Sequence, residues 1–238
     1  MRIVLLLLLG ACGRLSFDPS VADSGLAVPD APAVVDCSTL PNGAACDDRN
    51  VCTTTSSCRA GACVPEMPQA SCLLAASDAD FVNDVQGANG WTYGFWAAET
   101  DPSYEPATDF VLGVWDTNVF VPPNNVSPFL YLAWWGTHPD AGPSNVTVRR
   151  WTSNAQGPAK VRVQVSKGDT SCGDGVGATL VVDGTSRWHR AIAFDNGTGF
   201  DDVVDVELAV GTFVELHVAA GPDDSCDTTD STVTISSP

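Results

Sequence analysis

The sequence predicts an all-β protein in which most of the chain forms an antiparallel β-sandwich. Between residues 79 and 238, apolar and polar side chains alternate with period two, which is the pattern of half-buried strands. Valine, threonine, glycine and tryptophan are frequent there, whereas leucine is scarce after the first dozen residues. No stretch has the helical period that the crossovers of a parallel sheet require, so antiparallel pairing is favoured.

The alternation predicts the individual strands in chain order. Two turns between them have the composition of two-residue hairpins, Asp183-Gly184 and Gly211-Thr212. The expected strands cover residues 110–115, 129–135, 146–152, 160–165, 180–182, 188–194, 204–210, 214–218 and 232–236. Strands at this spacing, without helices, predict a sandwich that spans residues 79–238.

The first twelve residues have the pattern of an export signal. A short cationic start, M-R, precedes an unbroken apolar run at 3–9 and the word L-G-A-C at 9–12. This run is too short to span a bilayer as a helix, so residues 1–11 are predicted to be a signal peptide. L-G-A-C resembles the bacterial lipobox. The resemblance implies cleavage before Cys12 and lipidation of its thiol, and Gly13 beside it favours the outer membrane or cell surface of a Gram-negative bacterium.

The cysteine count agrees with this interpretation. Of nine cysteines, eight remain when Cys12 is assigned to the lipid, and an even number outside the cytoplasm predicts disulfides. Two of the eight, Cys172 and Cys226, lie far downstream. The other six lie close together, and the sequence leaves their pairing open: Cys37, Cys46, Cys52, Cys58, Cys63 and Cys72.

Two segments precede the predicted sandwich. Residues 12–35 are rich in alanine, aspartate, proline and serine, which predicts a disordered tether. Residues 36–73 are too few and too polar to form a core, so disulfides must stabilise them, and zinc is not expected because no C-x2-C pair occurs. The stretch 42–64, N-G-A-A-C-D-D-R-N-V-C-T-T-T-S-S-C-R-A-G-A-C-V, resembles a short Cys-rich repeat of secreted myxobacterial proteins. The resemblance implies a spacer or interaction module, although Arg49 stands where the repeat has glycine.

The net charge excludes one class of partner. The chain has 29 acidic and 11 basic side chains, a formal charge of -18 and a pI near 4.1. Such a chain repels phosphate backbones, and no cluster of lysine or arginine offers a local exception. Nucleic-acid binding is therefore not expected.

Several words in the large domain suggest a family. They are W-T-Y-G-F at 91–95, H-P at 138–139, V-R-R-W-T at 148–152, C-G-D-G-V at 172–176 and G-P-D-D-S-C-D at 221–227. Together they resemble a domain of extracellular proteins from myxobacteria and planctomycetes, and they are similar in pattern to the jelly-roll carbohydrate-binding modules of secreted glycoside hydrolases. The resemblance implies a jelly-roll-like sandwich that binds a polysaccharide or cell-surface glycan.

Aromatic side chains are the candidates for binding sugars. A sugar ring stacks its flat C–H face on an aromatic ring while nearby carboxylates and amides bind its hydroxyls. We assign Trp151 and Trp188 to the core, and expect the adjacent Trp134 and Trp135 to point to opposite faces of a strand. The candidates for sugar contacts, each of which could instead be a core side chain, are Trp91, Tyr93, Trp96, Trp115 and Trp135.

A structural calcium ion is a second candidate. A bridge between Cys172 and Cys226 would bring two aspartate-bearing loops together, and calcium prefers several oxygen ligands. The aspartates are equally consistent with solvated turns. The candidate ligands are Asp169, Asp174, Asp223, Asp224 and Asp227.

Catalytic motifs are lacking, because the sequence contains no G-x-S-x-G, H-E-x-x-H or phosphate-binding loop. We therefore expect a binding protein: a lipid-anchored extracytoplasmic lipoprotein with a carbohydrate-binding sandwich. Two alternatives remain open. One is a structural or protein-interaction lipoprotein, and the other is a hydrolase that uses two of the carboxylates of Glu99, Glu105, Glu207 and Glu215.

Overall fold

A computed structural model describes most of the chain beyond residue 35. The described residues are 36–47, 52–53, 55–65, 72–96, 103–124, 129–140 and 146–238. The predicted signal peptide, the predicted lipidation site Cys12 and the predicted tether lie outside them. No helix among the described residues is long and apolar enough to cross a membrane.

The Cys-rich module is a small antiparallel sheet held by disulfides. Its strands, in the order β1-β2-β3, are β1 (Ala45–Cys46), β2 (Ser56–Arg59) and β3 (Ala62–Pro65), after a 3-10 helix η1 (Cys37–Thr39). The six cysteines pair as Cys37–Cys58, Cys46–Cys63 and Cys52–Cys72. The prediction that they form disulfides is confirmed, and the structure supplies the pairing that the sequence left open.

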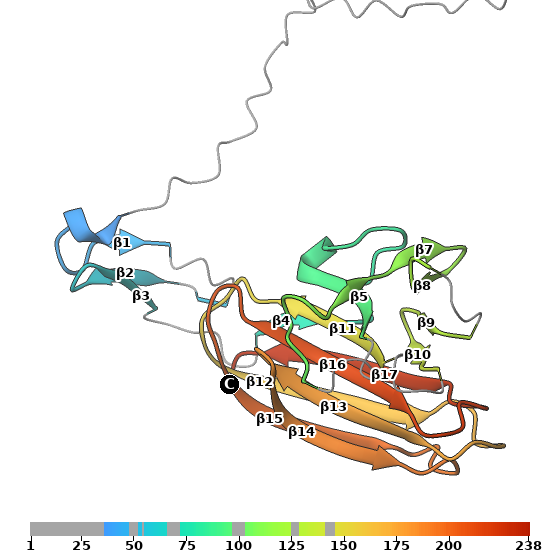
Figure 1. Cartoon of the computed structure of the whole chain (residues 1–238). Coiled ribbons are helices and arrows are strands. Elements are labelled where there is room, and N and C mark those ends of the chain that lie inside the picture. The colour runs from blue at the N-terminus through green and yellow to red at the C-terminus, as the bar shows by residue number, and fades with distance from the viewer. Residues whose placement is uncertain are drawn as a thin grey trace, which may run out of the picture. The chain divides into compact units, whose positions relative to one another are not determined.

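The rest of the described chain forms two antiparallel sheets (Figure 1). The eight-stranded sheet has the order β15-β12-β17-β10-β9-β8-β7, and β4 also pairs with β17. Its strands are β4 (Leu73–Ala76), β7 (Val114–Asp116), β8 (Val119–Val121), β9 (Tyr131–Leu132), β10 (Gly136–His138), β12 (Gly157–Lys167), β15 (Phe200–Leu208) and β17 (Thr229–Ser236). Because β4 belongs to it, this sheet begins at Leu73, before the expected start of the sandwich at residue 79.

The six-stranded sheet has the order β14-β13-β16-β11-β5-β6. Its strands are β5 (Trp91–Trp96), β6 (Val111–Leu112), β11 (Val146–Thr152), β13 (Val176–Val182), β14 (Thr185–Ile192) and β16 (Phe213–Ala220), and a short 3-10 helix η2 (Ala88–Gly90) leads into β5. The predicted all-β, antiparallel sandwich class is confirmed.

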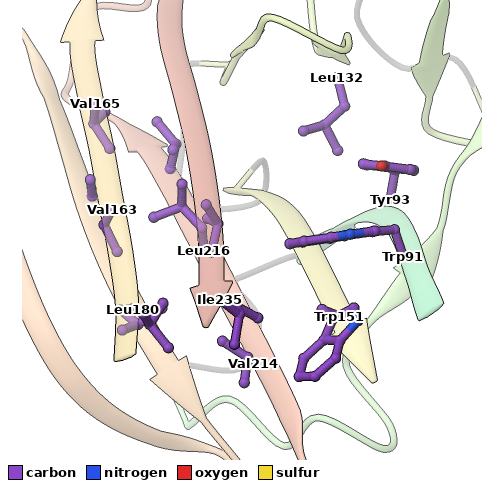
Figure 2. Close-up of a cluster of buried hydrophobic side chains, with 14 of the residues drawn as sticks. Trp91, Tyr93, Leu132, Trp151, Val163, Val165, Leu180, Val214, Leu216 and Ile235 are labelled. Atoms are coloured by element: carbon purple, nitrogen blue, oxygen red, sulfur yellow. The ribbon is translucent and has the colours of Figure 1, made fainter. Parts of the chain in front are cut away.

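One hydrophobic core lies between the inner faces of the two sheets. Figure 2 shows Val163 and Ile235 from the eight-stranded sheet in the same buried cluster as Leu216 and Trp151 from the six-stranded sheet. Trp151 and Trp188 are buried, as expected. The period-two alternation places every second side chain in this core, where removal of apolar surface from water stabilises the fold.

The two predicted hairpins have different outcomes. Asp183 and Gly184 connect β13 to β14 with positive φ angles of 46° and 74°, as a tight hairpin requires. The Gly211-Thr212 prediction is wrong, because β15 and β16 belong to different sheets. The connection passes from one sheet to the other and is bonded to Ser153. The Gly211 N–H donates to the Ser153 carbonyl at 2.7 Å, and the Ser153 N–H donates to the Thr212 carbonyl at 2.9 Å. Alternation identifies a buried face but not the partner strand.

β5 was not among the expected strands. Trp91, Tyr93 and Phe95 alternate into the core, while Gly94 leaves room for the Phe110 ring on the opposite side. The alternation of these rings with Thr92 and Gly94 is present in the sequence, but alternation alone does not tell whether a series of aromatic side chains faces a core or a ligand.

Candidate functional site

The outer face of the eight-stranded sheet carries an ordered array of polar side chains. In β12, side chains of even-numbered residues point outward because the odd-numbered valines enter the core. Arg162 donates from Nε to Asp201 Oδ1 at 2.6 Å, and Gln164 donates from Nε2 to Asp201 Oδ2 at 3.3 Å. Thr232 of β17 donates to Gln164 Oε1 at 3.2 Å. These bonds hold amide, hydroxyl and carboxylate groups at fixed positions on an exposed surface.

An aromatic row borders this polar array on β9, β10 and the residues beside them. The ring of Trp135 lies 6.1 Å from that of Tyr131, which lies 5.8 Å from His138. His138 in turn lies 6.2 Å from Phe129, whose side chain is 62% exposed. We call these four side chains the aromatic row.

Two hollows lie along the aromatic row, one at each end. The first, of about 350 Å³, has a lining that includes Trp135, Gln164, Phe200, Asp201, Asp230 and Thr232. The second, of about 390 Å³, has a lining that includes Phe129, Tyr131, His138, Asp169, Asp224 and Thr228. Because the Trp135 and Tyr131 rings are in contact, the row connects the two hollows, and each hollow combines aromatic rings with carboxylates and hydroxyls.

A buried arginine holds the turn that presents Trp135. Arg149 of β11 points inward and is 1% exposed. Its Nη2 donates to the carbonyls of Ala133 and Gly136 at 2.6 and 2.7 Å, and its Nε donates to Ser231 Oγ at 3.3 Å. Burial lowers the pKa of Arg149 to about 10, so it keeps its charge at neutral pH. The guanidinium therefore fixes both ends of the turn that contains the two adjacent tryptophans.

The expectation for the adjacent tryptophans needs correction. Trp134 and Trp135 lie in a turn between β9 and β10, not in a strand, so strand alternation does not separate them. Trp134 is 56% exposed, and Trp135 is half-buried in the aromatic row. Neither belongs to the core.

The other sugar-binding candidates have three different positions. Trp91 and Tyr93 are 0% and 1% exposed in the core, so their prediction as ligand contacts is wrong. The two rings point inward because every second side chain of β5, beginning with Trp91, faces the core. Trp115 is half-buried and packs against the Phe120 ring at 5.1 Å. Trp96 lies on the outer face of the six-stranded sheet, away from the aromatic row.

The predicted bridge between Cys172 and Cys226 is present, and several of the aspartates beside it have hydrogen-bond partners of their own. Asp169 accepts bonds from the Ser171 hydroxyl and backbone, which hold the pKa of Asp169 below its ordinary value. Asp223 is bonded in the same way by Ser225. Among the described residues, the one group of three candidate ligands within metal-binding range consists of cysteines, and these cysteines are in disulfides.

The positive charge at this end of the sandwich comes from a lysine. Lys167 donates from Nζ to Asp227 Oδ1 at 2.6 Å and to the Cys226 carbonyl at 2.7 Å, with both charged side chains fully buried. Burial raises the pKa of Asp227, and the nearby charge of Asp174 adds to this effect, while Asp174 itself accepts a bond from the backbone of Asp223 at 3.2 Å. The ammonium of Lys167 pairs with Asp227, the one buried carboxylate of the five candidate ligands.

One of the four candidate catalytic glutamates is buried in a bonded cluster. Glu215 Oε1 accepts bonds from Arg150 Nε and from the Tyr104 hydroxyl, both at 2.6 Å. Burial alone would raise the pKa of Glu215, but its contacts with His217, Tyr104 and Arg150 outweigh this and hold the pKa below its ordinary value. The carboxylate is therefore ionised and paired at neutral pH. Glu99 lies outside the described residues.

Comparison of the sequence with protein-family models and with curated proteins found no match.

The sequence made Trp135 a candidate, but not most of the side chains that lie around it. Tyr131, His138 and Phe129 become neighbours through the pairing of β9 with β10 and through the turns beside these strands. Arg149 had a usable signal, because it continues the inward series of Thr147 and Trp151 in β11. A charged side chain at a core position of a strand indicates a buried contact of this kind.

Proposed function

We propose that this protein is an extracytoplasmic lipoprotein whose β-sandwich binds a polysaccharide along the aromatic row. The observation that carries the proposal is the sequence of ring contacts from Trp135 through Tyr131 and His138 to Phe129. Successive sugar units of a chain each present a flat C–H face, so a line of rings can contact several of them in turn. A compact ligand would need only one hollow.

The polar groups beside the row match the hydroxyls of a sugar. Asp201 and Asp230 in the first hollow, and Asp169 and Asp224 in the second, are hydrogen-bond acceptors. Gln164 adds an amide, which can both donate and accept. Clefts that combine aromatic walls with a few fixed polar groups are typical of small-molecule and saccharide sites.

The lipid anchor is supported by the cysteines. All eight cysteines beyond Cys12 are paired in four disulfides, so Cys12 is the one thiol of the nine without a cysteine partner. The L-G-A-C word ends at the same residue. Mass spectrometry of the native protein should find a diacylglyceryl group on Cys12 as the first residue. An intact Met1 start would contradict the anchor without affecting the sugar-binding proposal.

A glycan array tests the binding function. The purified full chain, in detergent, is applied to immobilised polysaccharides and short oligosaccharides. We expect binding that increases with chain length, because longer chains contact more rings of the row. Absence of binding to every polysaccharide on the array would overturn the proposal. Binding to proteins in its place would favour the interaction-protein alternative.

A further inference from the structure

The outer face of the six-stranded sheet has a hollow of its own, remote in the fold from the aromatic row. It has a volume of about 230 Å³, and its lining includes Trp96, Tyr104, Thr179, Val181, Ser186 and His217. The side chains come from β5, β13, β14 and β16 and from the segment before β6. The inner faces of the two sheets meet in the core, so this outer face and the one that carries the aromatic row are on opposite sides of the sandwich.

Three aromatic rings form one wall of this hollow. The Tyr104 ring meets the His217 ring edge-on at 4.5 Å, and the Trp96 ring lies 4.9 Å from Tyr104 and 5.8 Å from His217. Glu215, two residues before His217 in β16, accepts a hydrogen bond from the Tyr104 hydroxyl at 2.6 Å. The rings give the hollow apolar surface against which the flat face of a ligand can pack.

The Tyr104 ring in this wall is fixed because Arg150, which bonds its hydroxyl, is itself held from several sides. Its guanidinium lies 3.8 Å from the Phe110 ring centroid and 4.5 Å from that of Phe213. Its Nη2 donates to the Tyr104 hydroxyl at 2.9 Å and to the Pro106 carbonyl at 2.6 Å. Since Arg150 also pairs with Glu215, the position of the carboxylate is fixed before any ligand arrives.

Two polar atoms of side chains that line this hollow are buried without a hydrogen-bond partner among the described residues. They are Trp96 Nε1 and His217 Nε2. His217 is 4% exposed. His217 Nε2 lies 3.6 Å from Glu215 Oε2, which is within ion-pair range but longer than a normal hydrogen bond. Buried polar groups are nearly always paired, and leaving one unpaired costs free energy, so two such atoms in the lining of one hollow indicate a missing ligand.

The unpaired atoms define the chemistry of that ligand. The Trp96 Nε1–H can only donate, whereas His217 Nε2 accepts or donates according to the tautomer of the ring. A hydroxyl group can pair with both, because it accepts from one and donates to the other. Arg150 already neutralises the charge of Glu215, so the hollow has no spare positive charge that would bind an anion. Several hydroxyls on a small uncharged ring meet all of these conditions.

We propose that this hollow binds one neutral, polyhydroxylated six-membered ring, of the size of a single monosaccharide. The ring stacks on Trp96 and Tyr104, and its hydroxyls pair with Trp96 Nε1–H and His217 Nε2. This site is independent of the aromatic row, which contacts a chain of sugars on the other face.

Calorimetric titration tests the proposal on the full chain, with glucose, galactose and myo-inositol as neutral probes and glucuronate as a charged one. At least one neutral ring should bind, and glucuronate should bind at least tenfold more weakly than the matching glucose. Failure of all three neutral probes to bind would overturn the proposal. Equal affinity for glucose and glucuronate would also overturn it, because the site would then ignore charge.

Two variants separate this site from the aromatic row. Trp96→Phe keeps an aromatic ring but removes the Nε1–H donor, and should weaken binding of the neutral ring at least tenfold while the thermal midpoint stays unchanged. Trp135→Ala should leave this affinity unchanged. The proposal is wrong if Trp96→Phe binds like the unaltered chain. Loss of polysaccharide binding in Trp135→Ala alone bears only on the aromatic row, so the two proposals fail separately.

Discussion

Arg149 and Arg150 are neighbours in the sequence, yet strand alternation sends their guanidinium groups to opposite sides of the six-stranded sheet. Arg149 enters the core and bonds the turn that carries Trp135. Arg150 supports the Glu215 carboxylate on the outer face. Each arginine therefore positions one of the two proposed binding sites without itself lining it.

Arg149→Lys tests the positioning role of this residue. A lysine ammonium cannot reproduce the fork that bonds Ala133 and Gly136 together with Ser231. We expect the free energy of unfolding to fall by about 2 kcal/mol, since buried hydrogen bonds from a charged group are lost. Polysaccharide affinity should fall as well.

Urea denaturation and titration measure these two effects of Arg149→Lys. Arg162→Lys is the matched control, because its pair with Asp201 is exposed and a surface pair is worth about 0–1 kcal/mol. Equal losses of stability in the two variants would contradict the role of Arg149.

The buried ion pair of Lys167 and Asp227 allows a second test, which asks whether the ammonium is needed to neutralise the carboxylate. Lys167→Met leaves a buried carboxylate without its partner, which should cost about 3–5 kcal/mol in chemical denaturation. The double variant Lys167→Met/Asp227→Leu removes both charges and should recover most of that loss. If the single variant were as stable as the unaltered chain, the ammonium would not be needed to neutralise Asp227.

The lowered pKa of Glu215 predicts that the stability of the fold depends on pH. Its folded pKa lies below the ordinary value of 4.5, so its contribution to stability is fully present above that value. The contribution is lost as the pH falls through the lowered folded pKa, where the carboxylate takes up a proton in the folded state too. Unfolding free energies measured down to about pH 3 should therefore fall less steeply for Glu215→Gln than for the unaltered chain. An identical slope for both proteins would contradict this assignment.

At the scale of elements, the sequence predicted which face of a strand is buried better than it predicted which strands pair. The expected strand at 146–152 coincides with β11, and the series Val161, Val163 and Val165 lies in the core as expected. By contrast, residues Gly211 and Thr212, which were expected to form a hairpin, connect strands of different sheets. Side-chain period reports which residues are buried, whereas pairing depends on contacts between segments far apart in the chain.

The same limit applies to the candidate site. The residues beside Trp91, Tyr93 and Trp135 do not tell which ring is covered, because this depends on how the two sheets stack. The calcium prediction stays a prediction, but the contact between Lys167 and Asp227 was missed for a related reason. Lys167 continues the inward series of β12, but the aspartates it would meet became known only when β12 and the loop before β17 were brought together.

The bridge between Cys172 and Cys226 is the element that holds this loop. It closes a separation of 54 residues, so the double variant Cys172→Ser/Cys226→Ser should lower the free energy of unfolding by up to about 4 kcal/mol. The second hollow, which Cys226 helps to line, should lose its shape as well. Denaturation midpoints of the two proteins measure the difference, and coincident midpoints would contradict a stabilising role for this bridge.

At the scale of the whole molecule, the sandwich offers two outer faces with different chemistry. The proposals give each face its own ligand, a sugar chain along the aromatic row on one face and a single ring in the hollow on the other. A formal charge of -18 suits neutral or cationic glycans better than acidic ones, because like charges repel. A lipid on Cys12 and a tether of some twenty residues would allow the sandwich to reach about 25 Å from the membrane.

Calorimetric titration of a polysaccharide into the full chain and its Trp135→Ala variant tests the aromatic row most directly. Trp135 lies at the end of the row on a turn fixed by Arg149, so removing its ring should leave the fold intact. We predict that Trp135→Ala binds the polysaccharide at least tenfold more weakly, a loss of about 1.4 kcal/mol or more, with an unchanged thermal midpoint. Equal affinity of the two proteins would contradict polysaccharide binding along the aromatic row.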